Sequence, residues 1–214
     1  KAEDLMAAGV TITDPYSTYI EQEVEVGQDT VILPGTMLQG KTKVGKNCTL
    51  GPDTQLTDVI CGDGNHLNRV YAHSCELGDN NEIGPFVHLR PETCLHNDIK
   101  IGNFVEVKNS DVDDGTKLPH LIYCGDSDLG KNVNFGCGTV TVNFDGKNKH
   151  RCTIDEHAFI GCNTNLVAPV HIGARAFTAA GSTITKDVPA KALAVGRAKQ
   201  VNIENWVKED TYKD

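Results

Sequence analysis

The chain has 214 residues and a formal net charge of −9 at pH 7, and 39% of its residues are hydrophobic. This length suits one sizeable domain, and the acidic balance argues against a nucleic-acid-binding surface over the whole protein. No apolar run approaches the roughly 20 residues that a membrane-spanning helix needs. We therefore expect no nucleic-acid partner and no membrane partner.

Residues 1–19 precede the regular part of the chain and form the first expected unit. Acidic residues early in residues 2–9 and the glycine at position 9 favour a short helix. With the linker to residue 19, this helix is expected to cap the open end of the following domain, where unpaired strand edges would otherwise be exposed.

Within residues 20–187 an apolar residue recurs at every sixth position in three runs, a spacing that matches neither a helix nor a simple alternating strand. Glycine often follows the repeated apolar residue, and a small or β-branched residue often comes four positions after it. The repeated positions form three runs: Ile20, Val26, Ile32, Leu38, Val44, Leu50 and Leu56; Leu77, Ile83, Leu89, Leu95, Ile101 and Val107; and Ile154, Ile160, Leu166, Ile172, Thr178 and Ile184.

This hexapeptide repeat predicts an all-β fold, a parallel β-helix. Each hexad supplies one short strand and one corner, and three hexads make one coil of a triangular prism that encloses the repeated apolar side chains. At about 18 residues a coil, residues 20–187 hold on the order of nine coils. Glycine and polar residues are expected at the corners, where the backbone needs a positive φ or a close approach.

Two segments depart from the repeat. Residues 143–152, NFDGKNKHRC, contain no repeated apolar position and are rich in Gly, Asn and Lys, so we expect a loop extruded from the prism. After Pro189 the repeats end, and we expect residues 188–214 to form a tail that folds over the last coil.

The eight cysteines indicate a reducing compartment. None forms a CxxC pair, and several occupy small-residue positions of the repeat, where Cys behaves as a small hydrophobe. No secretory signal precedes them. We expect free thiols and a cytoplasmic protein.

His120, in the segment KLPHLIYCGD, departs most from the repeat and is the first candidate for chemistry. Tyr123 follows three residues later, and Asn134 lies in the next hexads. A coil of about 18 residues would bring Glu106 and Lys108 near the same face as His120. The alternative is a solvated histidine at a corner.

The same spacing places Arg90 in register with Lys108, one coil apart. Two stacked cations repel each other, and an anionic ligand would relieve that repulsion. Neutralisation by Glu92 and Glu106 explains the pair equally well at this point.

Further cations gather in the loop and the tail, and in so acidic a chain they suggest sites for phosphate groups. They are Lys147, Lys149, His150 and Arg151 beside Asn143 in the loop, and Lys186, Lys191, Arg197 and Lys199 in the tail. Among the eight histidines no HxH or HxxxH pair occurs, so we expect no metal site. A zinc site assembled across subunits, as in hexapeptide-repeat carbonic anhydrases, remains an alternative.

Six segments carry a family resemblance: LRPETCL, IGNFVEVKNS, HLIYCGDSDLGKNVNFGCGT, VNFDGKNKH, AFIGCNTNLVAPV and AAGSTITKDVP. They resemble the acetyltransferase half of the bacterial bifunctional N-acetylglucosamine-1-phosphate uridyltransferases/glucosamine-1-phosphate N-acetyltransferases. The resemblance covers essentially all 214 residues, and its most specific part runs from His120 to Lys149. The Gly-rich pyrophosphorylase motif of the family's other half does not occur, so we expect no uridyltransferase activity.

This resemblance implies a left-handed coil and acetyl-CoA-dependent acetylation of the amine of glucosamine 1-phosphate, a step towards UDP-N-acetylglucosamine and cell-wall precursors. An ammonium group cannot attack a thioester, so a base with a near-neutral pKa is needed, and imidazole fits. By resemblance His120 is this catalytic base, and Glu106 is an orienting or second acid–base group. The main-chain N–H of Cys137 matches the donor to the oxyanion.

The remaining site positions are carried over from the family in the same way. The sugar-phosphate residues implied are Arg90, Lys108, Tyr123, Asn134, Asn143 and Lys149, and the acetyl-CoA residues implied are Cys137, Asn143, Phe144, Cys162, Ala180 and Arg197. Phe144 stands where many relatives have Tyr, and Glu92 stands where Gly is usual.

The resemblance also implies a homotrimer with active sites shared between subunits, which suits a prism whose own faces are shallow. Two alternatives stay open: a noncatalytic trimerisation scaffold for an N-terminal domain, and an acyltransferase of the same fold for another phosphorylated acceptor. The presence of His120 and of the loop cations argues against the scaffold. The Arg90/Lys108 pair favours a phosphorylated acceptor without identifying it.

Overall fold

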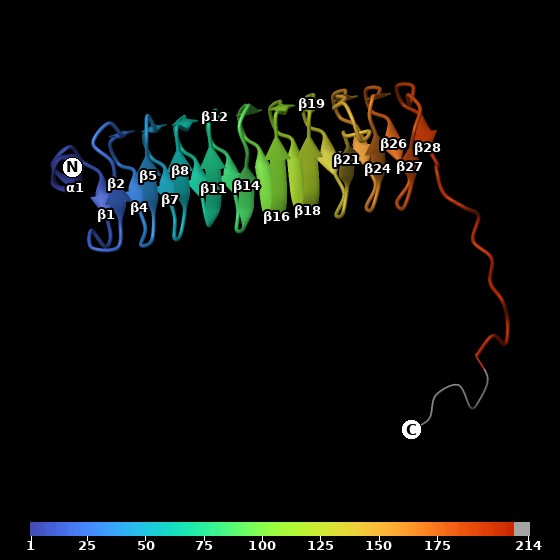
Figure 1. The fold of residues 1–214 in the computed structure, drawn as a ribbon, viewed down its shortest axis with the longest axis horizontal. Helices are drawn as coiled ribbons and strands as arrows, with labels where there is room; N and C mark the ends of the chain where they lie inside the picture. The colour runs from blue at the N-terminus through green and yellow to red at the C-terminus, as the bar shows by residue number, and fades with distance from the viewer. Residues whose placement is uncertain (208–214) are drawn as a thin grey trace.

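Short parallel strands stack coil upon coil along the length of the molecule, as the hexapeptide repeat predicts (Figure 1). The structure is a computed structural model, and it describes residues 1–207. The solenoid has about 10 turns, and a coil contributes strands to three flat faces around a narrow apolar interior. The predicted all-β parallel β-helix is confirmed.

The strands fall on three faces. The first face contains the opening halves of β16 (Lys100–Lys108) and β18 (Lys117–Gly125), with β1 (Thr11–Ile12), β4 (Val31–Ile32), β7 (Thr49–Leu50), β10 (His66–Leu67), β13 (Glu82–Ile83), β20 (Asn134–Phe135), β23 (Phe159–Ile160), β26 (Phe177–Thr178) and β28 (Leu193–Ala194). The second face contains the closing halves of β16 and β18, with β2 (Tyr19–Ile20), β5 (Met37–Gln39), β8 (Gln55–Thr57), β11 (Val70–His73), β14 (Val87–Leu89), β21 (Val140–Val142), β24 (Asn165–Val167) and β27 (Thr183–Ile184). The third face is a separate 9-stranded sheet of β3 (Glu25–Val26), β6 (Lys43–Val44), β9 (Ile60–Cys61), β12 (Cys75–Leu77), β15 (Thr93–Leu95), β17 (Asp111–Val112), β19 (Ser127–Leu129), β22 (Cys152–Ile154) and β25 (Val170–Ile172).

The repeated apolar residues fill the prism. Every member of the second and third runs is at most 4% exposed, and only Ile20 and Val26, near the first coil, are half-buried. The β-branched positions are buried as well, because their hydroxyl groups find carbonyl acceptors: Thr36 and Thr42 each donate over 2.7 Å, to the carbonyl oxygens of Leu33 and Gln39. All eight cysteines are free thiols.

At the N-terminal end, α1 (Ala2–Ala7) confirms the expected helix, with Leu5 buried against the first coil. Strand pairing begins before residue 20, because β1 pairs with β4. Among the described residues, no helix has the length and apolarity needed to cross a membrane.

At the C-terminal end the prism continues past residue 187. Phe177 pairs with Leu193 and Thr178 with Ala194. This last coil is shorter than three hexads, so the six-residue period in the sequence does not reveal it. Residues 197–207 are exposed and lead away from this coil (Figure 1). The expectation that the tail folds over the last coil is therefore wrong for these residues, and the rest of the predicted tail, 208–214, lies outside the described residues.

Candidate active site

One corner of the prism, between the first and second faces, holds His120. On both sides of this corner β18 is in register with the next coil, since residue 117 pairs with 134 and residue 123 with 140. His120 therefore lies opposite Cys137. The N–H of Gly138 donates to the carbonyl oxygen of His120 over 3.3 Å, which ties the two coils together at this point.

The same corner continues to two more of the expected acetyl-CoA residues. Residue 135 pairs with 160 and residue 160 with 178, so Cys137, Cys162 and Ala180 stack on consecutive coils. The N–H of Asn163 donates to the carbonyl of Cys137 over 2.7 Å, and the N–H of Gly181 donates to that of Cys162 over 2.8 Å. The side chains along this corner are small, so a ligand can approach the backbone.

On the preceding coil, Asn103 lies opposite His120. The side-chain oxygen Oδ1 of Asn103 is 3.0 Å from Nδ1 of His120, and the imidazole is exposed. An amide oxygen can only accept a hydrogen bond, so with Oδ1 facing Nδ1 this contact favours the tautomer that has the proton on Nδ1 and the lone pair on Nε2. Sequence reasoning missed Asn103, because a coil of three full hexads points to Gly102 instead.

Gly102 allows the close approach of the two strands that carry this pair. A Cβ atom added at Gly102 would lie 1.9 Å from the carbonyl oxygen of Pro119, the residue before His120. Only glycine fits at this point without moving the backbone of β18.

Cations gather at the next corner, where the second face meets the third. Residue 89 pairs with 107, so Arg90 and Lys108 stack in register as the repeat spacing predicts. Nη1 of Arg90 donates to Oε1 of Glu106 over 2.8 Å, and this hydrogen bond raises the pKa of the Arg90 guanidinium. Glu106 thus neutralises Arg90 in the isolated chain.

Glu106 does not lie beside His120. Its register partner is Tyr123, on the flat part of the second face, whereas His120 sits at the corner opposite Asn103. Coil stacking thus brings Glu106 to the second face, which His120 borders, and places it one coil before Tyr123. The coil is shorter than three hexads here, and the chain turns a corner at Leu121, with a φ of 52°.

Asp126 is a central residue of the cation cluster that sequence reasoning missed. Its side chain is only 4% exposed, it accepts hydrogen bonds from the side-chain amides of Asn109 and Asn143, and its Oδ1 lies 3.8 Å from Nζ of Lys108. Burial favours a higher pKa for Asp126, but the two hydrogen bonds and the charges of Lys108 and Lys149 outweigh burial and lower it. The coil here is shorter than three hexads, so Lys108 pairs with Gly125 and Asp126 follows directly. Recognising this short coil in the sequence would have placed Asp126 beside Lys108.

The extruded loop brings Asn143 and Lys149 to the same corner. The Asn143 amide nitrogen is 3.4 Å from the hydroxyl oxygen of Tyr123. The neighbouring Lys108 ammonium lowers the pKa of Lys149. Two ammonium groups that repel each other beside a tyrosine hydroxyl form a favourable place for an anion.

The loop itself is a tight hairpin. Phe144 and Lys149 form an antiparallel bridge, and the carboxylate of Asp145 accepts the backbone N–H groups of Lys147 and Asn148 over 2.7 and 2.6 Å. The hydrogen bond from Asn148, the contact with the His150 ring and the hydrogen bond from Lys147, in that order, lower the pKa of Asp145 to about 2. Lys149 is therefore held on an ordered turn.

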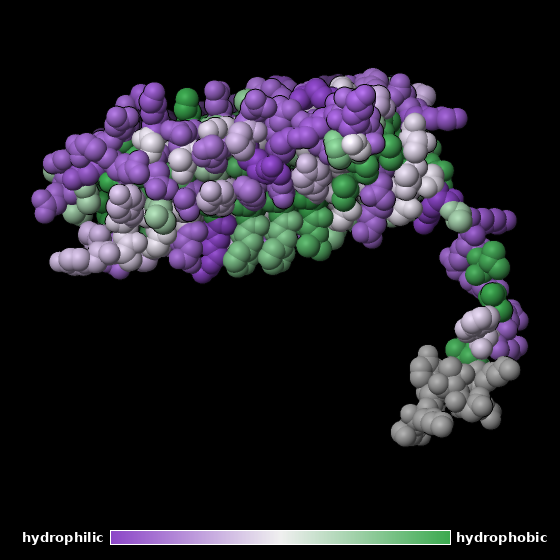
Figure 2. Space-filling view, viewed as in Figure 1, coloured by the Kyte–Doolittle hydropathy of each residue, from purple (hydrophilic) through white to green (hydrophobic). Residues whose placement is uncertain are grey.

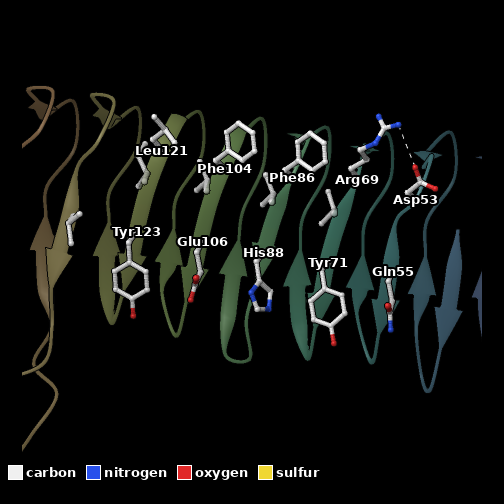
Figure 3. A pocket seen from close by; sticks show the side chains of 15 residues that line it. Asp53, Gln55, Arg69, Tyr71, Phe86, His88, Phe104, Glu106, Leu121 and Tyr123 are labelled. Atoms are coloured by element: carbon white, nitrogen blue, oxygen red, sulfur yellow. Dashed lines mark ion pairs between the residues drawn. The ribbon is translucent and has the colours of Figure 1, made fainter. Parts of the chain in front are cut away.

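Between the two corners the second face forms an open groove of about 800 Å³. Figure 3 shows Tyr123 and Glu106 side by side on successive coils, with His88 and Tyr71 continuing the row. One wall of the groove is missing, so a ligand bound here in one chain would remain largely in contact with water.

An apolar ridge, made of Phe86, Phe104 and Leu121, borders this groove (Figure 3). These side chains are 54–56% exposed, and the rings of Phe86 and Phe104 stack with centroids 5.4 Å apart. Each residue has a positive φ, which is costly for a bulky side chain. Figure 2 shows the resulting apolar strip along one edge of the central coils.

Three expected site residues lie apart from these groups within one chain. Asn134 is on the first face, where it pairs with Lys117 and Phe159. Phe144 is 55% exposed on the hairpin. Arg197 is exposed in the segment that leads away from the last coil.

Comparison with solved structures defines the class of fold. Francisella novicida UDP-N-acetylglucosamine acyltransferase has 15% sequence identity and a TM-score of 0.60, and the match covers 87% of this chain and 67% of that one. The Arabidopsis UDP-N-acetylglucosamine acyltransferase has 16% identity and a TM-score of 0.50, with 88% and 70% coverage. This chain is a left-handed parallel β-helix of the type found in these acyltransferases.

The sequence comparison is more specific. The chain is 56% identical over 97% of its length to the bifunctional protein GlmU of Caldanaerobacter subterraneus, and 54% identical over 94% to GlmU of a Geobacillus strain. It spans 45% and 44% of the length of these relatives. No protein-family model matches the chain. The chain is homologous to the C-terminal part of the GlmU proteins.

Proposed function

We propose that this protein is a cytoplasmic glucosamine-1-phosphate N-acetyltransferase that uses acetyl-CoA and acts in UDP-N-acetylglucosamine synthesis. The observation that carries the proposal is the second face itself, with an imidazole oriented by Asn103 at one corner and paired ammonium groups at the other. The similarity to GlmU supports glucosamine 1-phosphate as the acceptor.

In the proposed reaction, Nε2 of His120 removes a proton from the amine of the sugar. The amine nitrogen attacks the thioester carbonyl carbon, the new C–N bond forms, and the C–S bond breaks as the tetrahedral intermediate collapses. The proton on His120 then passes to the departing thiolate of CoA. The backbone N–H of Cys137, opposite His120, donates to the oxyanion, and the Cys137 thiol takes no covalent part.

The cation cluster binds the acceptor in this proposal. Arg90, Lys108 and Lys149 contact the phosphate through charge-assisted hydrogen bonds, and the Tyr123 hydroxyl adds a neutral one. Asn134 and Asn143 contact the sugar. Glu106 and Asp126 act as positioning residues, because the first holds Arg90 and the second holds Lys108 and Asn143.

Acetyl-CoA lies along the corner of Cys137, Cys162 and Ala180, where small side chains leave the backbone accessible. Phe144 and Asn143 flank it from the hairpin, and Arg197 contacts the phosphates of the cofactor. Because Arg197 lies far along an exposed segment, this contact is easiest to form with another copy of the chain.

We further propose a homotrimer in which neighbouring subunits share each site. The support is the groove without a second wall and the exposed Phe86–Phe104–Leu121 ridge along its border, since a large exposed apolar surface favours association. A subunit docked on the ridge would close the groove and bring its own hairpin or tail to the substrates.

The acceptor is tested by measuring release of free thiol from acetyl-CoA with glucosamine 1-phosphate, glucosamine and glucosamine 6-phosphate. Turnover with glucosamine 1-phosphate alone is expected. Turnover with another phosphorylated acceptor would replace the substrate but keep the chemistry. No turnover with any acceptor would favour the scaffold alternative.

Site sharing is tested by mixing inactive subunits. Lys149→Ala and His120→Ala subunits, unfolded together and refolded as mixed oligomers, should recover activity if His120 and Lys149 of one site come from different chains. Activity no greater than that of either parent would contradict site sharing between these two residues.

A further inference from the structure

A second cluster of reactive side chains lies on the third face, away from the groove. In residues 1–207, His, Cys, Asp and Glu side chains form two groups in which one possible ligand atom of each residue lies within 4.8 Å of those of the others. The first contains Cys94, His96 and Asp111, and the second contains His96, Asp113 and Asp114. Both groups share His96.

The β-helix register builds the first group. Strand β15 pairs with β17 so that Cys94 lies directly opposite Asp111, and Leu95 lies opposite Val112. Leu95 and Val112 point into the buried core, so their neighbours Cys94, His96 and Asp111 project from the outer surface of the sheet. Nε2 of His96 already contacts Oδ1 of Asp111 at 3.0 Å.

We propose that Cys94, His96 and Asp111 bind a zinc-type divalent transition-metal ion. A thiolate, an imidazole and a carboxylate are common zinc ligands, and in a tetrahedral zinc site such ligand atoms lie roughly 3–4 Å apart. The present separations, all within 4.8 Å, are close to that spacing. A water molecule would complete four ligands, and the thiol and imidazole select against magnesium and calcium.

The charges around the cluster also favour a cation. Cys94 lies between two carboxylate positions in the ladder, because Glu76 pairs with it from the preceding coil and Asp111 from the following coil. In the second group, by contrast, Asp114 is already engaged by Lys131 at 2.9 Å and by the Asn97 amide at 3.1 Å. The Cys94 group is therefore the better site.

A search for histidine pairs misses this site, which is why no metal site is expected from the sequence. Its ligands are a Cys-x-His at the end of one strand and an aspartate on the next coil, and only the coil length brings that aspartate opposite the cysteine. The site lies outside the proposed catalytic groove, so its metal would hold two coils together without taking part in acetyl transfer.

The test uses the full chain titrated with Co²⁺, which reports thiolate ligation by its charge-transfer absorption. We expect one Co²⁺ per chain with a thiolate band, displacement by Zn²⁺, and a higher Tm with Zn²⁺. Cys94→Ser should remove the band, and His96→Ala should weaken binding at least tenfold. His171→Ala is the matched control, because His171 pairs with Asp155 at 2.9 Å on the same sheet.

Three outcomes would overturn the proposal. A wild-type chain without a thiolate band excludes Cys94 as a ligand. A band that survives in Cys94→Ser places the metal on another cysteine. Co²⁺ binding that shows no thiolate band and is lost in His96→Ala would assign the ion to the group of His96, Asp113 and Asp114 instead.

Discussion

Asn103 and His120 lie opposite each other on adjacent coils, with Oδ1 of Asn103 3.0 Å from Nδ1 of His120. This contact favours one tautomer of the proposed general base without a neighbouring negative charge. Replacing Asn103 therefore tests the proposed role of His120 without touching the imidazole.

Asn103→Asp should move the acidic limb of the kcat/KM pH profile to higher pH. A carboxylate beside Nδ1 favours the imidazolium and raises the pKa of His120, so the neutral base is available only at higher pH. Asn103→Ala is the companion variant and should lower kcat by about tenfold, because the ring loses its orientation. An unchanged pH profile in Asn103→Asp would show that the acidic limb of the profile does not arise from protonation of His120.

Gly102→Ala should reduce kcat more than it alters the binding of acetyl-CoA. The added Cβ would meet the carbonyl oxygen of Pro119 at 1.9 Å, so the strand that carries His120 must shift away. Gly181→Ala is a control for glycine replacement near the same corner, because open space surrounds a Cβ at that position, although its φ of 72° adds backbone strain. Steady-state kinetics on both variants would show the difference, and equal losses would count against a specific role for Gly102.

Asp126→Asn should destabilise the fold by about 1.5–3 kcal/mol at pH 7, the range for hydrogen bonds to a charged group. The pKa of Asp126 is lowered below its ordinary 3.8 in the folded chain. Its contribution is therefore complete above the unfolded pKa and is lost as the pH falls through the folded pKa. Urea unfolding should show a gap between wild type and variant at pH 7 that narrows below pH 3.8.

The control for this variant is Asp98→Asn, since Asp98 also occupies a corner with a positive φ, of 58°. It should leave the affinity for glucosamine 1-phosphate unchanged, whereas Asp126→Asn should raise the KM because Lys108 and Asn143 lose their common partner. A pH-independent gap would mean that the Asp126 charge does not stabilise the fold.

Phe104→Asp should dissociate the proposed trimer. Aspartate tolerates a positive φ better than phenylalanine, so the corner can keep its conformation while the ridge loses an apolar side chain. Phe177→Asp is the matched control, because Phe177 is also half-exposed and stacks on Phe159 with ring centroids 5.3 Å apart. Sedimentation should show a smaller species for Phe104→Asp only, and a trimer in both variants would place the interface elsewhere.

The hexapeptide period predicted the fold because it records which side chains enter the prism. Leu38, Leu56 and Leu166, for example, are fully buried where the period places them. It also placed Arg90 over Lys108, because that coil consists of three full hexads.

The period failed where coils are shorter. The coil from Asn103 to His120 is shorter than three hexads, and for this reason His120 faces Asn103. The same short coil places Asp126 beside the cations. Coil length depends on how each corner packs, and the spacing of the buried residues does not report it. The proposed contact of Arg197 with acetyl-CoA involves another chain, and the period of a single chain carries no information about such a contact.

The most direct test of the proposed function is kcat for acetyl transfer to glucosamine 1-phosphate in His120→Ala, beside wild type and His171→Ala. We predict a fall of about 10²–10⁴-fold in His120→Ala, the range that general base catalysis supplies, and no such fall in His171→Ala. A kcat in His120→Ala close to that of wild type would contradict the assignment of His120 as the base.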